Sequence, residues 1–260
     1  MNFDPSTPFR VLDVGSGLGE WAIDMADTYP NAEVTAIDLV QQVLVSDQPN
    51  YHPISGVDMN DENWAGLQEA SFDFVRRSMP SGRVADWPRL LRRALWYLKP
   101  YTGQIEIVIM DWQPRSDPSE FPEDAEPLRR WYEDMVSASE RAGLPFAYRH
   151  DMKQLLKDAG FTDTSGGTEY RCPYWSGGDG DDARTVEIAD AMLASTTGSF
   201  EETGANIYAT LAMPLFTKYL GRSEQEVIRN CEQVVAAIRR RCTPLYHNVY
   251  VALRFHLHLA

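Results

Sequence analysis

Apolar residues in the first half of the chain form two kinds of pattern, short continuous runs and runs with helical spacing. The continuous runs are typical of strands that are buried on both faces of a parallel sheet. They lie at 9–14, 32–38, 71–75 and 104–110. Helical spacing predicts helices over 20–29 and 86–98, and a weaker run predicts a strand at 52–57. Strands and helices in this order indicate an α/β protein with a doubly wound sheet.

The second half of the chain is less regular. Its longest helical pattern runs over about 124–142 and stops at Gly143, and a shorter one covers 153–159. Residues 161–173 have the character of an extended strand, and the glycine- and aspartate-rich residues 176–182 read as a linker. The irregular block after the fifth predicted strand is of the kind that can cover an active site.

Clear local signals mark the last predicted elements. Two or three helices follow the linker, and the last of them opens with Ser223 and Glu226, which have the spacing of a capping box. Residues 246–255 then alternate polar with β-branched and aromatic side chains. This alternation predicts a final strand, antiparallel and at or near the edge of the sheet.

Composition and charge exclude several classes of function. The 260 residues include 24 basic and 38 acidic side chains, and the net charge of −14 opposes direct binding to nucleic acid or to an anionic membrane. Cys172, Cys231 and Cys242 are odd in number and lack metal-ligand spacing, so we expect neither a disulfide framework nor a metal site. Without a membrane-spanning run or a signal-peptide pattern, the chain is expected to be soluble and intracellular.

A glycine-rich turn follows the first predicted strand. Gly15, Gly17 and Gly19 allow the backbone to turn sharply and to approach a ligand closely before the first helix begins. Asp38 ends the second strand, nineteen positions after Gly19, where a carboxylate can accept hydrogen bonds from ribose hydroxyls. Strand, turn, helix and carboxylate together indicate a nucleotide-cofactor site, although a purely structural turn could use the same glycines.

The spacing within this turn differs from that of NAD-binding proteins. It reads Asp13-x-Gly15-x-Gly17-x-Gly19, not G-x-G-x-x-G, and it includes an acidic residue two positions before the first glycine. A carboxylate there repels a pyrophosphate but suits a cationic ligand such as the sulfonium end of S-adenosylmethionine. The chain thus resembles the class I S-adenosylmethionine-dependent methyltransferases, and an NAD-dependent oxidoreductase is disfavoured.

Further segments narrow the resemblance. They are Trp21-Ala-Ile-Asp-Met-Ala, Asp86-Trp-Pro, Leu98-Lys-Pro, Gln113-Pro-Arg-Ser-Asp117, Leu128-Arg-Arg-Trp-Tyr132, Arg141-Ala-Gly and Gln154-Leu-Leu-Lys-Asp-Ala-Gly-Phe161. Read together, these segments resemble the fungal LaeA-like methyltransferases from about Phe9 to Phe255. The resemblance implies one class I domain over 1–260 with a mostly parallel, seven-stranded Rossmann-like sheet and helical insertions. In it, 1–112 is the cofactor-binding half, and 113–260 carries the insertion, the acceptor side and the final strands.

The resemblance also implies cofactor-binding residues beyond the glycine turn. In the family an acidic side chain after the third strand contacts the adenine amine, and Asp58 is the matching residue here, with a solvated acidic turn as the alternative. Arg77, after the fourth predicted strand, matches the family arginine better than Arg76. Either of these residues, or Arg115, could orient a carboxylate of the cofactor or substrate, and the alternative for all three is a surface ion pair. Leu39 and Met59, which follow Asp38 and Asp58 directly, are assigned to the same site.

In two places the chain departs from the family pattern. Members usually carry an N-terminal segment that is able to close over the cofactor, and hardly any residues precede the glycine turn here. The turn after Pro100 reads Tyr-Thr-Gly-Gln where the family has glycine-rich residues and a tryptophan. Without such a lid we expect a more hydrated cofactor.

Methyl transfer from a sulfonium requires alignment of the acceptor, and a base only when the acceptor must lose a proton. His150 and His247 are the open candidates for such a base, since the other histidines lie before a core strand or near the chain end. The resemblance implies that the methyl acceptor is a protein or a fungal metabolite. Relatives include nuclear regulators of secondary metabolism that bind velvet-family proteins, so the chain is expected in the nucleus or cytoplasm. Two alternatives stay open: a scaffold that binds such a partner with little catalysis, and a small-molecule tailoring enzyme.

Overall fold

The computed structural model describes residues 4–40, 46–64, 66–78, 82–116, 121–162, 167–174, 207–240 and 245–253. The described strands are β1 (Phe9–Val14), β2 (Ala32–Asp38), β3 (Tyr51–Ser55), β4 (Phe74–Ser78), β5 (Gln104–Ser116), β6 (Thr168–Pro173) and β7 (Leu245–Leu253). The described α-helices are α1 (Glu20–Thr28), α2 (Trp87–Tyr97), α3 (Glu126–Arg141), α4 (Met152–Ala159), α7 (Ile207–Leu220) and α8 (Glu224–Arg240), and a 3-10 turn, η1 (Glu123–Ala125), precedes α3.

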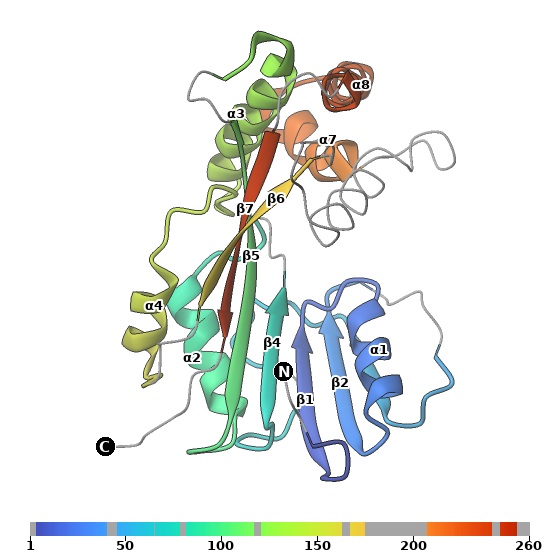
Figure 1. Cartoon of the computed structure of the whole chain (residues 1–260), viewed down its shortest axis with the longest axis vertical. Helices are drawn as coiled ribbons and strands as arrows, with labels where there is room; N and C mark the ends of the chain where they lie inside the picture. Colours follow the sequence, from blue (N-terminus) through green and yellow to red (C-terminus); the bar gives the residue numbers. More distant parts are fainter. Residues whose placement is uncertain are drawn as a thin grey trace, which may run out of the picture. The chain divides into compact units, whose positions relative to one another are not determined.

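The strands form one sheet in the order β3-β2-β1-β4-β5-β7-β6. β1 pairs in parallel with β2 and β4, β2 with β3, and β4 with β5. Figure 1 shows β1, β2 and β4 with their arrows in one direction and α1 beside β2. The predicted α/β Rossmann-like sheet with an antiparallel last strand is confirmed.

The chain divides into two compact units. Unit 1 comprises Met1–Ile109, Arg149–Thr168 and Tyr250–Ala260, and unit 2 comprises Met110–Tyr148 and Glu169–Val249. Strands β5 and β7 each contribute residues to both units. The predicted division into a cofactor-binding half and an acceptor side stays a prediction, because contacts between residues do not by themselves assign function.

The core of unit 1 lies between α1 and the parallel strands. Val11 and Leu12 of β1 are fully buried, as expected of a central strand that is covered on both faces. Ala22 and Ala26 of α1 are also fully buried and belong to the same apolar cluster as Val11. Their small side chains allow the helix to pack closely on the strands that carry the glycine turn at their carboxyl ends.

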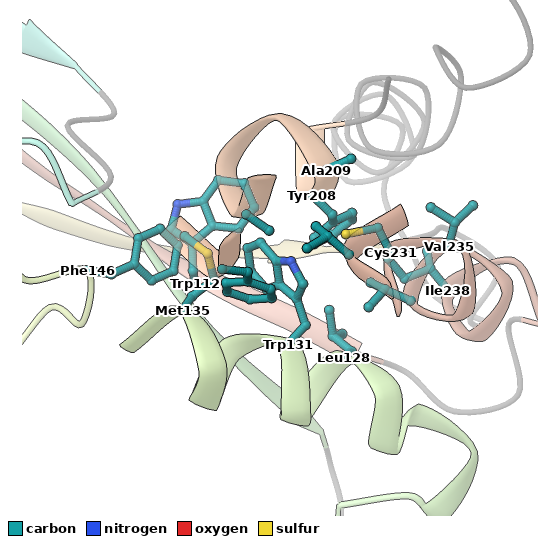
Figure 2. Packing of buried hydrophobic residues seen from close by; sticks show 14 of the residues in the cluster. Trp112, Leu128, Trp131, Met135, Phe146, Tyr208, Ala209, Cys231, Val235 and Ile238 are labelled. Atoms are coloured by element: carbon teal, nitrogen blue, oxygen red, sulfur yellow. The ribbon is translucent and has the colours of Figure 1, made fainter. Parts of the chain in front are cut away.

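Unit 2 has a separate apolar core between α3, α7 and α8. Figure 2 shows its aromatic centre, where Trp112, Trp131, Phe146 and Tyr208 gather. The rings of Trp131 and Tyr208 meet edge to face, with centroids 4.8 Å apart. Such pairs contribute beyond the area that they bury. Helices α3 and α8 thus each bury an apolar stripe in this cluster.

Most predicted boundaries agree with the structure, but four differ. Strand β4 lies three residues later than the predicted 71–75, because its pairing with β5 continues to Ser78, opposite Val108. Arg76 and Arg77 therefore lie within this strand and not in a loop after it. Strand β5 continues six residues beyond the predicted Met110, because burial of Asp111 and Trp112 keeps this part of the chain within the sheet. Strand β6 begins at Thr168, not at Phe161, which packs as a buried residue directly after α4. Helix α3 begins at Glu126 because Glu123–Ala125 form a 3-10 turn before Pro127. The predicted linker at 176–182 lies outside the described residues.

Candidate functional site

The glycine turn connects β1 to α1 and requires its glycines. Gly15, Gly17 and Gly19 have φ angles of 67°, 62° and 88°, in the left-handed region that side chains with a Cβ rarely adopt. Gly19 is also the N-cap residue of α1. The chain therefore reverses direction at the carboxyl end of β1, where open α/β sheets hold their ligands.

The end of β2 holds the amide groups of this turn. The carbonyl oxygen of Ile37 accepts hydrogen bonds from the N–H groups of Gly15 at 2.8 Å and Ser16 at 3.1 Å. The Asp38 carboxylate accepts from Gly17 N–H through Oδ2 at 2.8 Å and from Val40 N–H through Oδ1 at 2.9 Å. Each carboxylate oxygen keeps a further acceptor position, so the predicted role of Asp38 toward ribose hydroxyls is compatible with this geometry.

Asp13 lies on one face of the sheet rather than at the rim of the turn. It is adjacent in register to Arg76 of β4, which is adjacent to Glu106 of β5. Arg76 lies 3.7 Å from the Asp13 carboxylate and donates to Glu106 at 3.1 Å, and its guanidinium stacks over the Trp21 ring at 4.2 Å. Burial raises the pKa of the Asp13 carboxyl to about 6, against the opposing effect of Arg76 and Arg77. Asp13 thus belongs to a buried ionic network beneath α1.

Arg77 and Met59 enclose Gly15. The Arg77 guanidinium donates from Nη1 to the carbonyl oxygens of Val14, Gly15 and Ser78, at 3.1, 3.0 and 2.9 Å. A Cβ added at Gly15 would lie 2.7 Å from Arg77 Nη1 and 2.9 Å from the Met59 methyl group. Two residues assigned to the cofactor site from the sequence are thus in direct contact with the turn. Arg115, by contrast, forms an ion pair with Asp111 at 2.6 Å.

Asp58 follows β3 and is half-buried. Its Oδ1 accepts from the backbone and side-chain amides of Asn60, at 2.8 and 3.0 Å. Asn60 also donates to Arg83 O and accepts from Ala85 N–H, both at 2.9 Å, and so connects the loop after β3 to the residues before α2. The sequence analysis missed Asn60, since nothing in its spacing shows that these two loops meet.

An exposed apolar rim borders the site. Leu18 of the glycine turn and Leu39 and Val40 after Asp38 are 53%, 62% and 60% exposed. A Cβ added at Gly17 would meet no atom within 4 Å, so the space over this residue is open. Open space, a carboxylate with unused acceptor positions and an apolar rim fit a cofactor that combines ribose hydroxyls with a flat apolar ring.

The two candidate bases lie in different surroundings. His150 is exposed and its ring lies 6.5 Å from that of Trp87. His247 is fully buried in unit 2, where its Nε2 hydrogen-bonds to the Tyr174 hydroxyl and its ring lies 5.4 Å from that of Trp112. Burial lowers the pKa of His247 to about 3, so this imidazole is neutral at physiological pH. A catalytic role for either histidine stays a prediction.

Within the described residues, no group of three or more histidine, cysteine, aspartate or glutamate side chains is placed to hold a metal ion. None of the helices in this part of the chain is both long and apolar enough to cross a membrane. Three of the five histidines and two of the three cysteines lie in this described part. His256, His258 and Cys242 lie outside it.

Comparisons with known proteins agree with this geometry. The profile of the family described as "Methyltransferase domain" matches residues 2–165. The chain is 43% identical over 173 residues to the secondary metabolism regulator LAE1 of Cochliobolus heterostrophus, covering 65% of this chain and 55% of that protein. It is 36% identical over 162 residues to the protein-methionine methyltransferase laeA of Emericella nidulans, covering 59% and 40%. The chain thus spans about half the length of these two curated relatives.

A solved structure supports the fold independently. Phosphoethanolamine N-methyltransferase 2 of Haemonchus contortus, in complex with S-adenosyl-L-methionine, is similar with a TM-score of 0.54 over 97% of this chain and 49% of that chain. The two sequences are only 16% identical, so this likeness concerns the arrangement of helices and strands.

Proposed function

This chain belongs to the methyltransferase-domain family, and on that premise we propose that it is an S-adenosylmethionine-dependent methyltransferase of the LaeA-like type, linked to the regulation of fungal secondary metabolism. The observation that carries the proposal is the pairing of Gly17 N–H with the Asp38 carboxylate beside open space over the glycine turn. This pairing holds a ribose acceptor and a tight turn together at the carboxyl ends of β1 and β2.

The residues of this chain would bind and orient the cofactor. When bound, S-adenosylmethionine supplies a methyl group on a positively charged sulfur, which an acceptor displaces in line. Asp38 would hold the ribose, and Asp58 would hold the adenine amine. Leu39 and Met59 would provide apolar contact. Arg76 offsets part of the charge of Asp13 and is shared with Glu106, so Asp13 acts on a ligand more weakly than a lone carboxylate would.

The acceptor is proposed from the relatives. The Emericella nidulans relative is named as a protein-methionine methyltransferase. A methionine thioether carries no proton, so methylation of such an acceptor would need no general base. This fits the properties of His247, because burial and a pKa of about 3 make its imidazole a weak base. A fungal metabolite remains the second acceptor class, and a velvet-type partner remains an expectation from the resemblance.

Isothermal titration with S-adenosylmethionine and with S-adenosylhomocysteine tests the proposal. We expect dissociation constants on the order of micromolar for the unmodified chain. Asp38→Ala should weaken binding about tenfold or more, because it removes both the ribose acceptor and the bond that fixes Gly17 N–H. The matched control is Asp24→Ala on the exposed face of α1, which should leave binding unchanged.

The scaffold alternative predicts a different result. A chain that binds neither nucleoside, yet unfolds cooperatively, would contradict the enzyme and favour a partner-binding role. In a chain that does bind the cofactor, Gly17→Arg separates the two roles, because it fills the open space over the turn, whereas a scaffold should keep its partner after this change. Loss of both nucleoside binding and methyl transfer in this variant supports the enzyme, whereas a variant that retains full transfer activity would exclude the proposed site.

A further inference from the structure

Arg77 is an unusual residue for the position that it occupies. Its side chain is only 3% exposed, and burying a guanidinium costs several kcal/mol unless other groups compensate. Its Nε has no hydrogen-bond partner within the described part of the chain, so some of that cost is uncompensated. The carboxylates of Asp13 and Asp38 offset part of its charge. A buried charge that is retained at this cost calls for a role that an apolar side chain could not supply.

The contacts of Arg77 fall on one side of the glycine turn. Its Nη1 donates to the carbonyl oxygens of Val14 and Gly15, while Ile37 O accepts the N–H groups of Gly15 and Ser16 on the other side. These four groups belong to two consecutive peptide units. Both peptide groups are therefore held at both ends, the carbonyl oxygen by Arg77 of β4 and the N–H by Ile37 of β2. Gly17 N–H, in the next peptide unit, then meets the Asp38 carboxylate.

Steric fit reinforces this clamp, by which we mean the hold of Arg77 and Ile37 on the two peptide groups of the glycine turn. The guanidinium occupies the position that a side chain at residue 15 would need, with Nη1 and Cζ 2.7 and 2.9 Å from a Cβ built there. Gly15 and Arg77 thus fit each other, because the missing Cβ allows the guanidinium to reach both carbonyl groups.

From this arrangement we propose that Arg77 is a positioning residue, which presets the glycine turn for the cofactor through the contacts of Nη1 with the turn. The proposal deepens the proposed function and rests on it. Three carbonyl acceptors share the two hydrogens of Nη1, so this nitrogen has no donor left for a ligand. A turn that is already ordered loses less conformational entropy when the cofactor binds. We expect Arg77 to raise the affinity for the cofactor in this way.

Two measurements on Arg77→Met test the proposal. Hydrogen exchange at the Gly15 and Ser16 amides, followed by NMR without any nucleoside, reports whether the turn is preset. Titration with S-adenosylhomocysteine reports the affinity. Loss of charged hydrogen bonds predicts exchange that is about ten- to a hundredfold faster and a dissociation constant that is raised by a similar factor. Arg92→Met, which removes an exposed arginine of α2, is the matched control and should change neither.

A conservative variant and chemical rescue keep the test decisive if Arg77→Met folds poorly. Arg77→Lys retains a cation and should recover part of the affinity. Arg77→Ala should bind S-adenosylhomocysteine more tightly when guanidinium ion is added at millimolar concentration, and sodium chloride at equal ionic strength should not reproduce this gain. A role limited to general stability would give no such rescue.

The possible outcomes separate the proposals. An unmodified chain that binds no nucleoside contradicts the proposed function, while the exchange measurement still tests the clamp on its own. Unchanged exchange in folded Arg77→Met overturns the inference. Weaker binding with unchanged exchange also overturns it, because Arg77 would then act by touching the cofactor. Faster exchange with weaker binding and guanidinium rescue supports it.

Discussion

At the scale of single residues, the contact between Gly15 and Arg77 predicts an effect on stability. Gly15→Ala must place a Cβ 2.7 Å from the guanidinium at a φ of 67°. We expect the free energy of unfolding to fall by about 2 to 4 kcal/mol, from left-handed strain together with overpacking. Urea unfolding of the purified variant measures this loss.

Gly56→Ala is the control for this substitution. Gly56 has a φ of 79°, but a Cβ added there would meet no atom within 4 Å. It should therefore show only the backbone strain, about 1 to 2 kcal/mol. Equal losses in the two variants would show that the guanidinium yields to the new side chain.

Asp13 predicts a pH dependence at the same scale. Its folded pKa of about 6 is higher than the usual value of 3.8, so the folded state binds a proton more tightly than the unfolded state. The contribution of Asp13 to stability is therefore largest below about pH 4 and is lost as the pH rises to about 6, by about 3 kcal/mol at most. Asp13→Asn should gain in stability relative to the unmodified chain between pH 4 and 7, as measured by urea unfolding. A parallel pH dependence of the two proteins would contradict this.

Single residues also show what could be predicted from the sequence. The three glycines and Asp38 are close in sequence, and the spacing of the glycines indicates a tight turn that other residues could not form. The turn and its partner strand were therefore predictable. Arg77 was assigned to the site only by resemblance, and its actual contacts were not foreseen. It lies 62 residues after Gly15, and only the parallel pairing of β1 and β4 brings the two together.

At the scale of elements, the capping box that opens α8 is confirmed and supports a prediction. Ser223 Oγ accepts from Glu226 N–H at 3.3 Å, and the Glu226 carboxylate accepts from Ser223 N–H at 2.8 Å. Ser223→Ala should reduce the free energy of unfolding by about 1 kcal/mol, because the Glu226 amide loses its acceptor. Glu232→Ala, on the exposed face of the same helix, should change it by less than about 0.5 kcal/mol. Thermal unfolding compares the two, and equal losses would contradict a special role for the cap.

Element boundaries were predictable where local signals exist. Asp86 caps α2 and Gly160 ends α4 as expected, because cap chemistry depends on neighbouring residues. The extension of β5 to Ser116 was not predicted, since Asp111 and Gln113 interrupt the apolar run. The burial of Asp111 and of Trp112, which packs in the core of unit 2, explains why the strand continues.

At the scale of the whole molecule, the division into units was beyond the reach of periodicity. Residues 149–168 belong to unit 1 although they follow a long segment of unit 2. Their helix, α4, packs on α2, and no repeat or spacing in the sequence predicts that contact. Hydrophobic patterns show that a helix has an inner face, but they do not show which surface that face covers.

The two units should respond to pH in opposite directions. His247 in unit 2 has a folded pKa of about 3, lower than the usual 6.5, so acidification protonates the unfolded state first and removes stability as the pH falls from about 6.5 toward 3. Asp13 in unit 1 acts in the reverse sense between pH 6 and 4. Hydrogen exchange followed by mass spectrometry at pH 7 and pH 5, corrected for the intrinsic exchange rate, should therefore show protection falling in α3 and α8 relative to β1 and β2. His247→Gln should reduce this difference, by an amount equivalent to about 2 kcal/mol, whereas His52→Gln in unit 1 serves as the control for loss of a histidine. A difference that persists unchanged in His247→Gln would assign the acid response of unit 2 to another group.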